Sequence, residues 1–339
     1  MVDASPQATI GVLGAGSWGT ALAIQLARAG RTTWLWGRSL EHLAELARDR
    51  RNLRYLPEAD FPANLGIEGD LAHLAAKADI LLLAVPSHGV RALLRDIAPR
   101  LDRRVPVAWA SKGLEHPQGK LLHEVAAEVL GAEWPVAVLS GPTFAQEVAR
   151  GLPTAVTIAS AHAGFAQELA VCISSESFRA YTSGDIVGVE VGGAVKNVLA
   201  IGTGIADGLG LGANTRVALI TRGLVEMTRL GLAVGAQRDT FAGLAGLGDL
   251  VLTCTDDQSR NRRFGLALAA GRAVAEAQAE IRQVVEGVQG ASAVRGMALR
   301  AGVEMPICEQ IYRMIHEGLA PQQAVHALMT RTLKPEQSV

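Results

Sequence analysis

Residues 10–30, IGVLGAGSWGTALAIQLARAG, hold the pattern that decides the fold of this chain. A short apolar run is followed by a glycine-rich loop and then by an alanine- and leucine-rich stretch that ends in glycine, the order of a strand, a turn and a helix. In such a unit Gly14 allows a tight turn, Gly16 lets the backbone approach a pyrophosphate, and Gly19 lets helix and strand pack closely. The pattern therefore predicts a dinucleotide site at the N-terminus of this helix.

The second apolar run, Thr33–Trp36, reads as the next strand and is followed by Gly37-Arg38-Ser39. Proteins that bind NAD usually place Asp or Glu at this point for the ribose hydroxyls, whereas an arginine accommodates the 2′-phosphate of NADP. Arg38 therefore favours NADP(H), with NAD(H) as the alternative. Arg38 could also be an ordinary surface residue that opens the helix expected from Ser39 to about Arg50.

The pattern of strand and helix continues well beyond the glycine loop and then stops. Further strands are expected at 80–85, 105–110, 136–139, 155–159 and 178–182, with helices near 71–77, 87–98 and 118–130. Apolar strands that alternate with helices indicate a parallel sheet covered on both faces. After about 186 only helical patterns follow. The predicted fold is an α/β Rossmann-type doubly wound sheet domain, residues 1–186, followed by an all-α helical domain, residues 187–339.

Ligands of such sheets bind at the carboxyl ends of the strands. Three segments follow predicted strands directly: Pro86–His88, Ser111–Glu115 and Ser140–Ala145. The second of them contains Lys112, and lysine is rare in this chain. Only five of the 32 basic residues are lysines. Since arginine is the usual cation of this chain, a lysine in an apolar setting suggests a group whose proton can move.

A second lysine, Lys196, lies in the almost wholly apolar run Gly192–Asp207, which reads as a core helix with one polar stripe. Removal of an ammonium from water lowers its pKa toward neutrality, which suits general acid and base chemistry. The alternative is a lysine near a helix end whose charged head reaches solvent. Lys196 is the first candidate for a catalytic group.

Two further segments of the helical domain carry polar candidates. Asp249 is the one carboxylate in a glycine-rich apolar turn, Gly243–Thr255, where it could act in a site or simply cap the following helix. Ser259-Arg260-Asn261 places a hydroxyl, a guanidinium and an amide side by side, a set that fits a phosphate or carboxylate. The alternative for this loop is a solvated basic helix start.

Composition excludes several classes of protein. The chain has 339 residues, 49% of them hydrophobic, and a net charge of −1 with 4% aromatics, so a nucleic-acid partner is not expected. Met1–Thr9 lacks the plan of a signal peptide, and no apolar run reaches the roughly 18–20 residues of a membrane span. Cys172, Cys254 and Cys308 are odd in number and widely spaced, so we expect a reducing cytoplasm and no metal site, although Cys254 could be a nucleophile.

Several separated motifs together resemble one enzyme family, and the similarity runs from about residue 9 to about residue 325. The motifs are GAGSWGTA from Gly14, SKG from Ser111, SGPTFA from Ser140, GAVKN from Gly193, GLGDL from Gly246 and SRN from Ser259. In their order and spacing they resemble the bacterial NAD(P)-dependent glycerol-3-phosphate dehydrogenases. The resemblance implies reversible hydride transfer between NAD(P)H and dihydroxyacetone phosphate, giving sn-glycerol 3-phosphate for phospholipid synthesis, by a cytoplasmic homodimer.

The resemblance also implies roles for individual residues. Lys196 would be the acid that protonates the ketone oxygen, and the base in reverse, with Lys112 and Asp249 completing the polar cluster. The substrate would be held by these three and by Gly141, Thr143, Ser259, Arg260 and Asn261. The cofactor would be contacted by Gly14, Gly16, Ser17, Trp18, Gly19, Arg38, Lys112, Ala145, Arg260, Val284 and Glu286.

Two rival hypotheses remain. A β-hydroxyacid dehydrogenase shares the sheet domain, the helical domain and a lysine, but it binds a carboxylate and its substrate loops do not resemble those of this chain. A nucleotide-sensing protein without turnover would need the glycine loop. It would have no use for Lys196, Lys112 and Asp249 in apolar surroundings, which favours an enzyme.

Overall fold

The computed structural model describes residues 8–101 and 104–332. Met1–Gln7, most of the segment that lacks the plan of a signal peptide, lie outside the described residues. The chain forms two compact units. One comprises the residues up to Ser111 together with Leu122–Ile186, and the other comprises Lys112–Leu121 together with the residues from Val187 onward. The sequence analysis assigns Lys112–Leu121 to the first domain, whereas this segment packs in the second unit. The domain limit between residues 186 and 187 stays a prediction.

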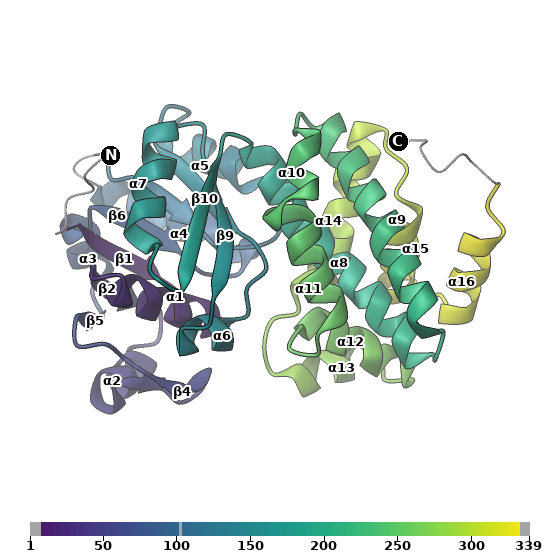
Figure 1. The fold of residues 1–339 in the computed structure, drawn as a ribbon, viewed down its shortest axis with the longest axis horizontal. Coiled ribbons are helices and arrows are strands. Elements are labelled where there is room, and N and C mark those ends of the chain that lie inside the picture. The colour runs from purple at the N-terminus through teal and green to yellow at the C-terminus, as the bar shows by residue number, and fades with distance from the viewer. Residues whose placement is uncertain (1–7, 102–103, 333–339) are drawn as a thin grey trace. The chain divides into compact units, whose positions relative to one another are not determined.

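The first unit is built on an eight-stranded sheet with the order β10-β9-β8-β7-β6-β1-β2-β5 (Figure 1). The strands are β1 Thr9–Leu13, β2 Thr32–Trp36, β5 Leu65–Glu68, β6 Ile80–Leu83, β7 Val107–Trp109, β8 Val136–Ser140, β9 Thr154–Ala159 and β10 Phe178–Ser183. β1 lies between β2 and β6 and is parallel to both. Every strand expected from the sequence is present, and the doubly wound class is confirmed.

One pair departs from the expected parallel arrangement, because β8 and β9 run antiparallel. A parallel pair needs a crossover connection that returns over the face of the sheet. The connection between β8 and β9 holds only the six-residue helix α6, Ala145–Arg150, which packs against α1. The expectation of a uniformly parallel sheet is therefore wrong at this pair.

Helices cover the sheet, and a small ladder lies beside it. The helices are α1 Ser17–Arg28, α2 Leu40–Asp49, α3 Leu71–Lys77, α4 Val90–Ile97, α5 Leu122–Leu130, α6 and α7 Ala163–Ile173, with single 3-10 turns at Ser87–Gly89 and Ala98–Arg100. The ladder joins β3, Arg51–Asn52, to β4, Leu56–Asp60, in antiparallel register. The sequence patterns did not predict β3, β4 or the edge strand β5.

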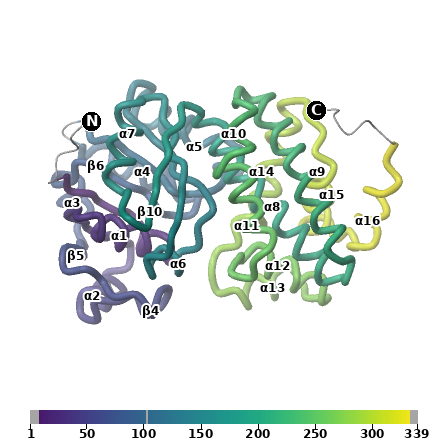
Figure 2. The backbone as a smooth tube through the Cα atoms, in the orientation of Figure 1, coloured from purple at the N-terminus to yellow at the C-terminus, as the bar shows by residue number. Residues whose placement is uncertain are grey.

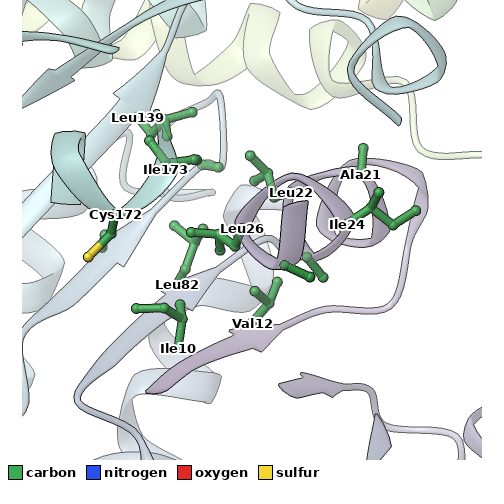
Figure 3. Packing of buried hydrophobic residues seen from close by; sticks show 14 of the residues in the cluster. Ile10, Val12, Ala21, Leu22, Ile24, Leu26, Leu82, Leu139, Cys172 and Ile173 are labelled. Carbon is green, nitrogen blue, oxygen red and sulfur yellow. The ribbon is translucent and has the colours of Figure 1, made fainter. Parts of the chain in front are cut away.

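The core of the first unit lies between α1 and the central strands. Figure 3 shows Ile10 and Val12 of β1, Leu22 and Leu26 of α1, and Leu82 of β6 packed together. All five side chains are fully buried. Burial of each such side chain stabilises the fold by about 1.5–3 kcal/mol. This packing holds the N-terminus of α1 at the carboxyl end of β1.

The second unit is helical, as expected (Figure 2). Its helices are α8 Ile186–Gly208, α9 Gly212–Ala233, α10 Arg238–Ala242, α11 Asp249–Thr255, α12 Arg260–Ala269, α13 Val274–Ile281, α14 Glu286–Ala301, α15 Pro306–His316 and α16 Pro321–Met329, and one π turn, η3, spans Leu244–Gly248. Within the described ranges α8 alone is long and apolar enough to cross a membrane, with a mean hydropathy of 1.3. Since 89% of that window is buried inside the protein, α8 is a core helix.

Glycines let α12 approach α8 at van der Waals distance. A Cβ at Gly204 would lie 2.2 Å from the carbonyl oxygen of Arg262, and a Cβ at Gly265 would lie 2.2 Å from that of Ile201. Neither position accepts a side chain without moving a helix. This close crossing brings the first residues of α12 next to the polar stripe of α8.

Candidate active site

A buried carboxylate between two ammonium groups forms the centre of the helical unit. Asp249 is 1% exposed, and its Oδ1 accepts a hydrogen bond from Lys196 Nζ at 2.8 Å. Its Oδ2 accepts one from Lys112 Nζ, also at 2.8 Å. Three of the polar candidates from the sequence, Lys112, Lys196 and Asp249, therefore meet in one cluster.

Two helices and one inserted segment position this cluster. Lys196 lies on α8 and is 5% exposed, which excludes the alternative of a solvated charged head. Asp249 is the first residue of α11, directly after the π turn η3, and Gly248 occupies the N-cap position of that helix. Capping by Asp249 was the other interpretation of the sequence, and the structure does not place it there. Lys112 comes from the segment Lys112–Leu121.

Thr253 completes the cluster and was not identified from the sequence. Lys196 Nζ donates to Thr253 Oγ1 at 2.9 Å, and the hydroxyl donates onward to the carbonyl oxygen of Asp249 at 2.6 Å. The signal was the spacing of four residues, which places Asp249 and Thr253 on one face of a helix. Thr253 therefore fixes the position of the Lys196 ammonium beside the carboxylate.

The electrostatics of the cluster follow from burial and from mutual charge. Burial lowers the pKa of Lys112 to about 8, an effect that the nearby Lys196 ammonium adds to and the Asp249 charge opposes. Burial alone would raise the pKa of Asp249, but the charges and hydrogen bonds of Lys112 and Lys196 outweigh it and hold this pKa below its usual value. With two cations and one anion, the cluster favours negative charge on a bound molecule.

A chain of buried amides fixes the backbone beside the cluster. Asn197 Nδ2 donates to the carbonyl oxygens of Lys112, at 2.9 Å, and of Gly193, at 3.1 Å. Asn261 Nδ2 donates to Asn197 Oδ1 at 2.9 Å, and Asn261 Oδ1 accepts from the Gly287 amide at 2.9 Å. Asn261, expected at the substrate, thus also links α12 to α8 and α14, and its substrate contact stays a prediction. Asn197 was not assigned a role from the sequence.

The three arginines at the start of α12 lie in three different environments. Ser259 caps the helix by accepting from the Arg262 amide at 3.2 Å. Arg262 is 8% exposed and pairs with Asp207 and with Asp257, so its role is structural. Arg263 is exposed to solvent. Arg260 is the remaining candidate for an anion.

Arg260 is partly buried and contacts the segment that precedes Val284 and Glu286, two residues expected at the cofactor. Its Nη1 donates to Gln283 Oε1 at 3.2 Å, which ties it to the residues just before Val284 and Glu286. Burial lowers the pKa of the Arg260 guanidinium, and the Glu286 charge partly offsets this. The parallel donors of a guanidinium are suited to hold an anion. Val284 is exposed and Glu286 opens α14.

The glycine loop of the first unit fits a dinucleotide. Gly14 has a φ of +131°, and a Cβ there would lie 2.5 Å from the carbonyl oxygen of Ala84. A Cβ at Gly19 would lie 1.8 Å from the carbonyl oxygen of Gly14, so packing requires both glycines. At Gly16 no atom lies within 4 Å of the same position. The fold does not need glycine there, and the open space suits the approach of a phosphate.

The other expected contacts of the first unit lie at the carboxyl ends of strands. Ser17 and Trp18 open α1, and Trp18 Nε1 is buried with no hydrogen-bond partner among the described residues. Arg38 is exposed just after β2. Thr143 Oγ1 donates to the carbonyl oxygen of Gly141 at 3.2 Å. Ala145 begins α6. Their contacts with ligands stay predictions.

Cysteine chemistry is absent from this cluster. Cys172, Cys254 and Cys308 are free and buried. Burial raises the pKa of the Cys254 thiol to about 12, so the nucleophile is held in its unreactive protonated form. The alternative of a catalytic cysteine therefore finds no support in the structure.

A glycine loop on a doubly wound sheet, joined to a helical unit with a buried Lys-Asp-Lys cluster, defines a dinucleotide-dependent dehydrogenase. Two family models match the chain: "NAD-dependent glycerol-3-phosphate dehydrogenase N-terminus" over residues 9–166 and the corresponding "C-terminus" over residues 185–326. The chain belongs to the NAD-dependent glycerol-3-phosphate dehydrogenase family, and the resemblance read from its motifs is confirmed.

Curated relatives and solved structures agree with this assignment. The glycerol-3-phosphate dehydrogenase (NAD(P)+) of Aeromonas hydrophila is 57% identical over 97% of this chain and 99% of its own length. That of Pseudoalteromonas translucida is 55% identical over 96% and 97%. The crystal structure of the Coxiella burnetii glycerol-3-phosphate dehydrogenase is 48% identical, with a TM-score of 0.93 over 96% of this chain and 100% of that chain. A 3-hydroxyisobutyrate dehydrogenase, 17% identical with a TM-score of 0.55, shares the fold alone.

Proposed function

We propose that this protein catalyses the reversible reduction of dihydroxyacetone phosphate to sn-glycerol 3-phosphate with NAD(P)H, and so supplies glycerophospholipid synthesis. The observation that carries the proposal is the buried cluster in which Asp249 lies between the ammonium groups of Lys196 and Lys112. Reduction of a ketone builds negative charge on its oxygen, which such a cluster can stabilise and then protonate. A nucleotide sensor would not need the cluster of Lys196, Lys112 and Asp249. The substrate loops of a β-hydroxyacid dehydrogenase do not resemble those of this chain.

The residues divide the proton chemistry between them. When bound, the reduced nicotinamide supplies the hydride. Lys196 gives its proton to the ketone oxygen, and Asp249 and Thr253 hold its ammonium in position. The ammonium of Lys112 donates to the second carboxylate oxygen of Asp249, Oδ2. It adds a second positive charge to the site, which stabilises the negative charge of the transition state. In the reverse direction neutral Lys196 takes the proton of the alcohol.

The proposed reaction is tested by mixing the purified protein with NADPH and dihydroxyacetone phosphate and following the absorbance of the reduced nicotinamide. We expect consumption that requires both compounds. A β-keto acid in place of the ketone phosphate should give little turnover. Binding of NADPH without turnover of any ketone would favour a sensor, and turnover of the keto acid alone would favour the β-hydroxyacid enzyme.

Removal of Arg260 tests how the substrate phosphate is held. Each charge-assisted hydrogen bond to an anion contributes about 1.5–3 kcal/mol, so Arg260→Ala should lower kcat/KM for dihydroxyacetone phosphate by about 10- to 100-fold or more. Arg260→Lys should also lose activity, because an ammonium cannot replace the two parallel bonds of a guanidinium. Unphosphorylated dihydroxyacetone should lose much less.

The matched control is Arg263→Ala, which removes an exposed arginine from the same helical turn. It should leave kcat/KM for both ketones close to that of the wild type. Both variants are compared at one ionic strength and saturating cofactor. Equal losses on the two ketones in Arg260→Ala would mean that Arg260 serves the cofactor or the fold, and that the phosphate is bound elsewhere.

The preference for NADP(H) is part of the proposal and rests on Arg38 after β2. Arg38→Asp exchanges a bidentate donor for a negative charge, so kcat/KM should fall by about 10-fold or more for NADPH and much less for NADH. The exposed Arg48 of α2 provides the control Arg48→Asp, which should change neither value. Steady-state kinetics with both cofactors decide the matter. Equal losses for the two would show that Arg38 does not discriminate between them.

We also propose a homodimer in the cytoplasm, which follows from the family and not from a feature of the structure. Sedimentation equilibrium of the purified protein tests the dimer. Fractionation of cells that express the chain tests its location. A stable monomer with full activity would overturn the first part of this proposal.

A further inference from the structure

The side-chain amide of Asn52 bonds to both ends of the turn that carries the glycine loop into α1. Asn52 lies in β3 and is fully buried. Its Nδ2 donates to the carbonyl oxygen of Ala15 at 3.1 Å and to Thr20 Oγ1 at 2.7 Å, which uses both amide hydrogens. Ala15 precedes the turn and Thr20 follows it, so one group from a distant segment spans residues 16–19.

The start of α1 has no side-chain cap, unlike the starts of α2 and α12. Ser39 and Ser259 occupy the N-cap positions of α2 and α12, and the side chain of each accepts a hydrogen bond from a backbone amide of its helix. The N-cap of α1 is Gly16, which has no side chain to serve in this way. The amides at the start of α1 are thereby left for an anion. Support for the turn must come from contacts that do not occupy those amides.

Asn52 meets this requirement. It contacts one carbonyl and one hydroxyl, and it takes no backbone amide of the turn. Since Asn52 and Thr20 are each fully buried, the bond between them lies away from water, where an unpaired partner would be unfavourable. The two bonds join residues 15 and 20 through one side chain.

We propose that Asn52 is a positioning residue that fixes the turn between Ala15 and Thr20 in the conformation that binds the cofactor diphosphate. The inference rests on the proposed function, because it assumes that the glycine loop is the diphosphate site. Asn52 acts through the loop and does not touch the reacting atoms. Its removal therefore affects affinity for the dinucleotide and spares the proton chemistry of the helical unit.

Asn52→Leu keeps the approximate volume and removes both donors. We expect the Kd of NADPH, measured by fluorescence without substrate, to rise about tenfold, on the scale of one to two lost hydrogen bonds. KM for NADPH should rise in parallel, while kcat at saturating NADPH and KM for dihydroxyacetone phosphate change by less than about threefold. Hydrogen exchange of the backbone amides of residues 15–20 should accelerate in the protein without cofactor.

Gln25→Leu is the matched control. Gln25 lies in α1, the helix that Asn52 contacts; it is 1% exposed and donates twice through Nε2, to the Ile173 carbonyl at 2.9 Å and to Ser175 Oγ at 3.0 Å. Its replacement removes the same two kinds of hydrogen bond, a carbonyl and a hydroxyl partner, away from the turn. We expect a comparable loss in the urea midpoint of unfolding and an unchanged Kd for NADPH. Equal Kd values in Asn52→Leu and Gln25→Leu would overturn the proposal.

Thr20→Val keeps the proposal testable if Asn52→Leu does not fold. Valine has nearly the shape of threonine and removes only the acceptor of the 2.7 Å bond. The Kd of NADPH should rise about threefold, as for the loss of one weak hydrogen bond. An unchanged Kd and unchanged amide exchange in a folded Thr20→Val protein would count against a role for Asn52.

Gly16→Ala separates failure of this inference from failure of the proposed diphosphate site. The added methyl group meets no atom within 4 Å, so the fold should be unaffected. The Kd of NADPH should rise, because the methyl group occupies the space that a phosphate would approach. Unchanged affinity in Gly16→Ala would show that the diphosphate binds elsewhere. Weakened binding in Gly16→Ala with normal binding in Asn52→Leu would overturn the role of Asn52 alone.

Discussion

Lys196→Met is expected to lower kcat by about two to four orders of magnitude, the usual contribution of a positioned proton donor. Methionine fills a similar volume but carries no proton. Asp249 keeps its bond to Lys112, and Thr253 keeps its bond to the Asp249 carbonyl oxygen, so the cluster should survive the exchange. The Kd of NADPH should stay close to that of the wild type. Stopped-flow measurement of a single turnover reports the chemical step directly.

Two further variants show what the loss means. Lys196→Arg keeps the positive charge but has a pKa too high to release a proton, so it should also be slow if proton transfer matters. Lys77→Met removes an exposed lysine that lies over the Trp34 ring, and it should leave kcat unchanged. Wild-type turnover in Lys196→Met would show that another group protonates the ketone. Full activity in Lys196→Arg would reduce the role of Lys196 to its charge.

Asp249→Asn is expected to cause a milder loss of activity than Lys196→Met, because asparagine leaves a hydrogen-bonding group in place, but it should lower stability as well. The exchange leaves two ammonium groups in a buried site without their shared counter-ion. Loss of one partner from a buried ion pair destabilises a protein by about 3–5 kcal/mol. Activity should fall by about two orders of magnitude, because the carboxylate that holds the Lys196 ammonium in position is gone. Urea unfolding and steady-state kinetics measure the two effects.

The destabilisation of Asp249→Asn should depend on pH. The pKa of Lys112 is already lowered to about 8, and the Asp249 charge is what opposes a further decrease. A cation whose pKa is lower in the folded state penalises folding while it stays protonated, and the penalty decreases as the pH rises from the folded pKa to the unfolded one. The variant should therefore recover part of its stability as the pH rises from below about 8 toward the unfolded lysine pKa of about 10.4.

The wild type should behave in the opposite way in acid. The pKa of Asp249 is lowered in the folded state, so its stabilising contribution is present above its unfolded value and is lost as the pH falls through the folded one. Asp257→Asn is the control, because that carboxylate is 70% exposed and its partner Arg262 keeps a second carboxylate, Asp207. It should change stability by less than about 1 kcal/mol at any pH. Equal effects of the two exchanges would contradict the importance of burial.

Much of this architecture could be read from the sequence because the relevant signals are local. The glycine loop lies between an apolar run and a helical pattern, and each glycine has a separate steric reason. The same holds for Lys196, whose apolar neighbours indicate burial within one helix. Strands β3, β4 and β5 were missed because they are short and their apolar residues are interrupted by charged residues, proline or glycine, so neither alternation nor an apolar run marks them.

Contacts between distant segments could not be read in this way. Lys112 and Asp249 are 137 residues apart, and nothing in either local pattern indicates that the Lys112 ammonium binds the Asp249 carboxylate. The antiparallel direction of β9 relative to β8 depends on where α6 packs, and this packing involves segments that are distant in the sequence. Asn197 and Asn52 look like ordinary polar residues until their partners, Lys112 and Ala15, are known.

The segment Lys112–Leu121 has a consequence for how the enzyme is made. It is synthesised in the middle of the sheet unit, yet it is packed into the helical one. More than a hundred further residues must therefore be translated before Asp249 is present and can pair with Lys112. The glycine loop has no such delay, since Gly14, Thr20 and Asn52 are all among the first sixty residues. A chain that ends near 186 contains the sequence of the glycine loop but lacks both Lys196 and Asp249, so we expect it to be inactive.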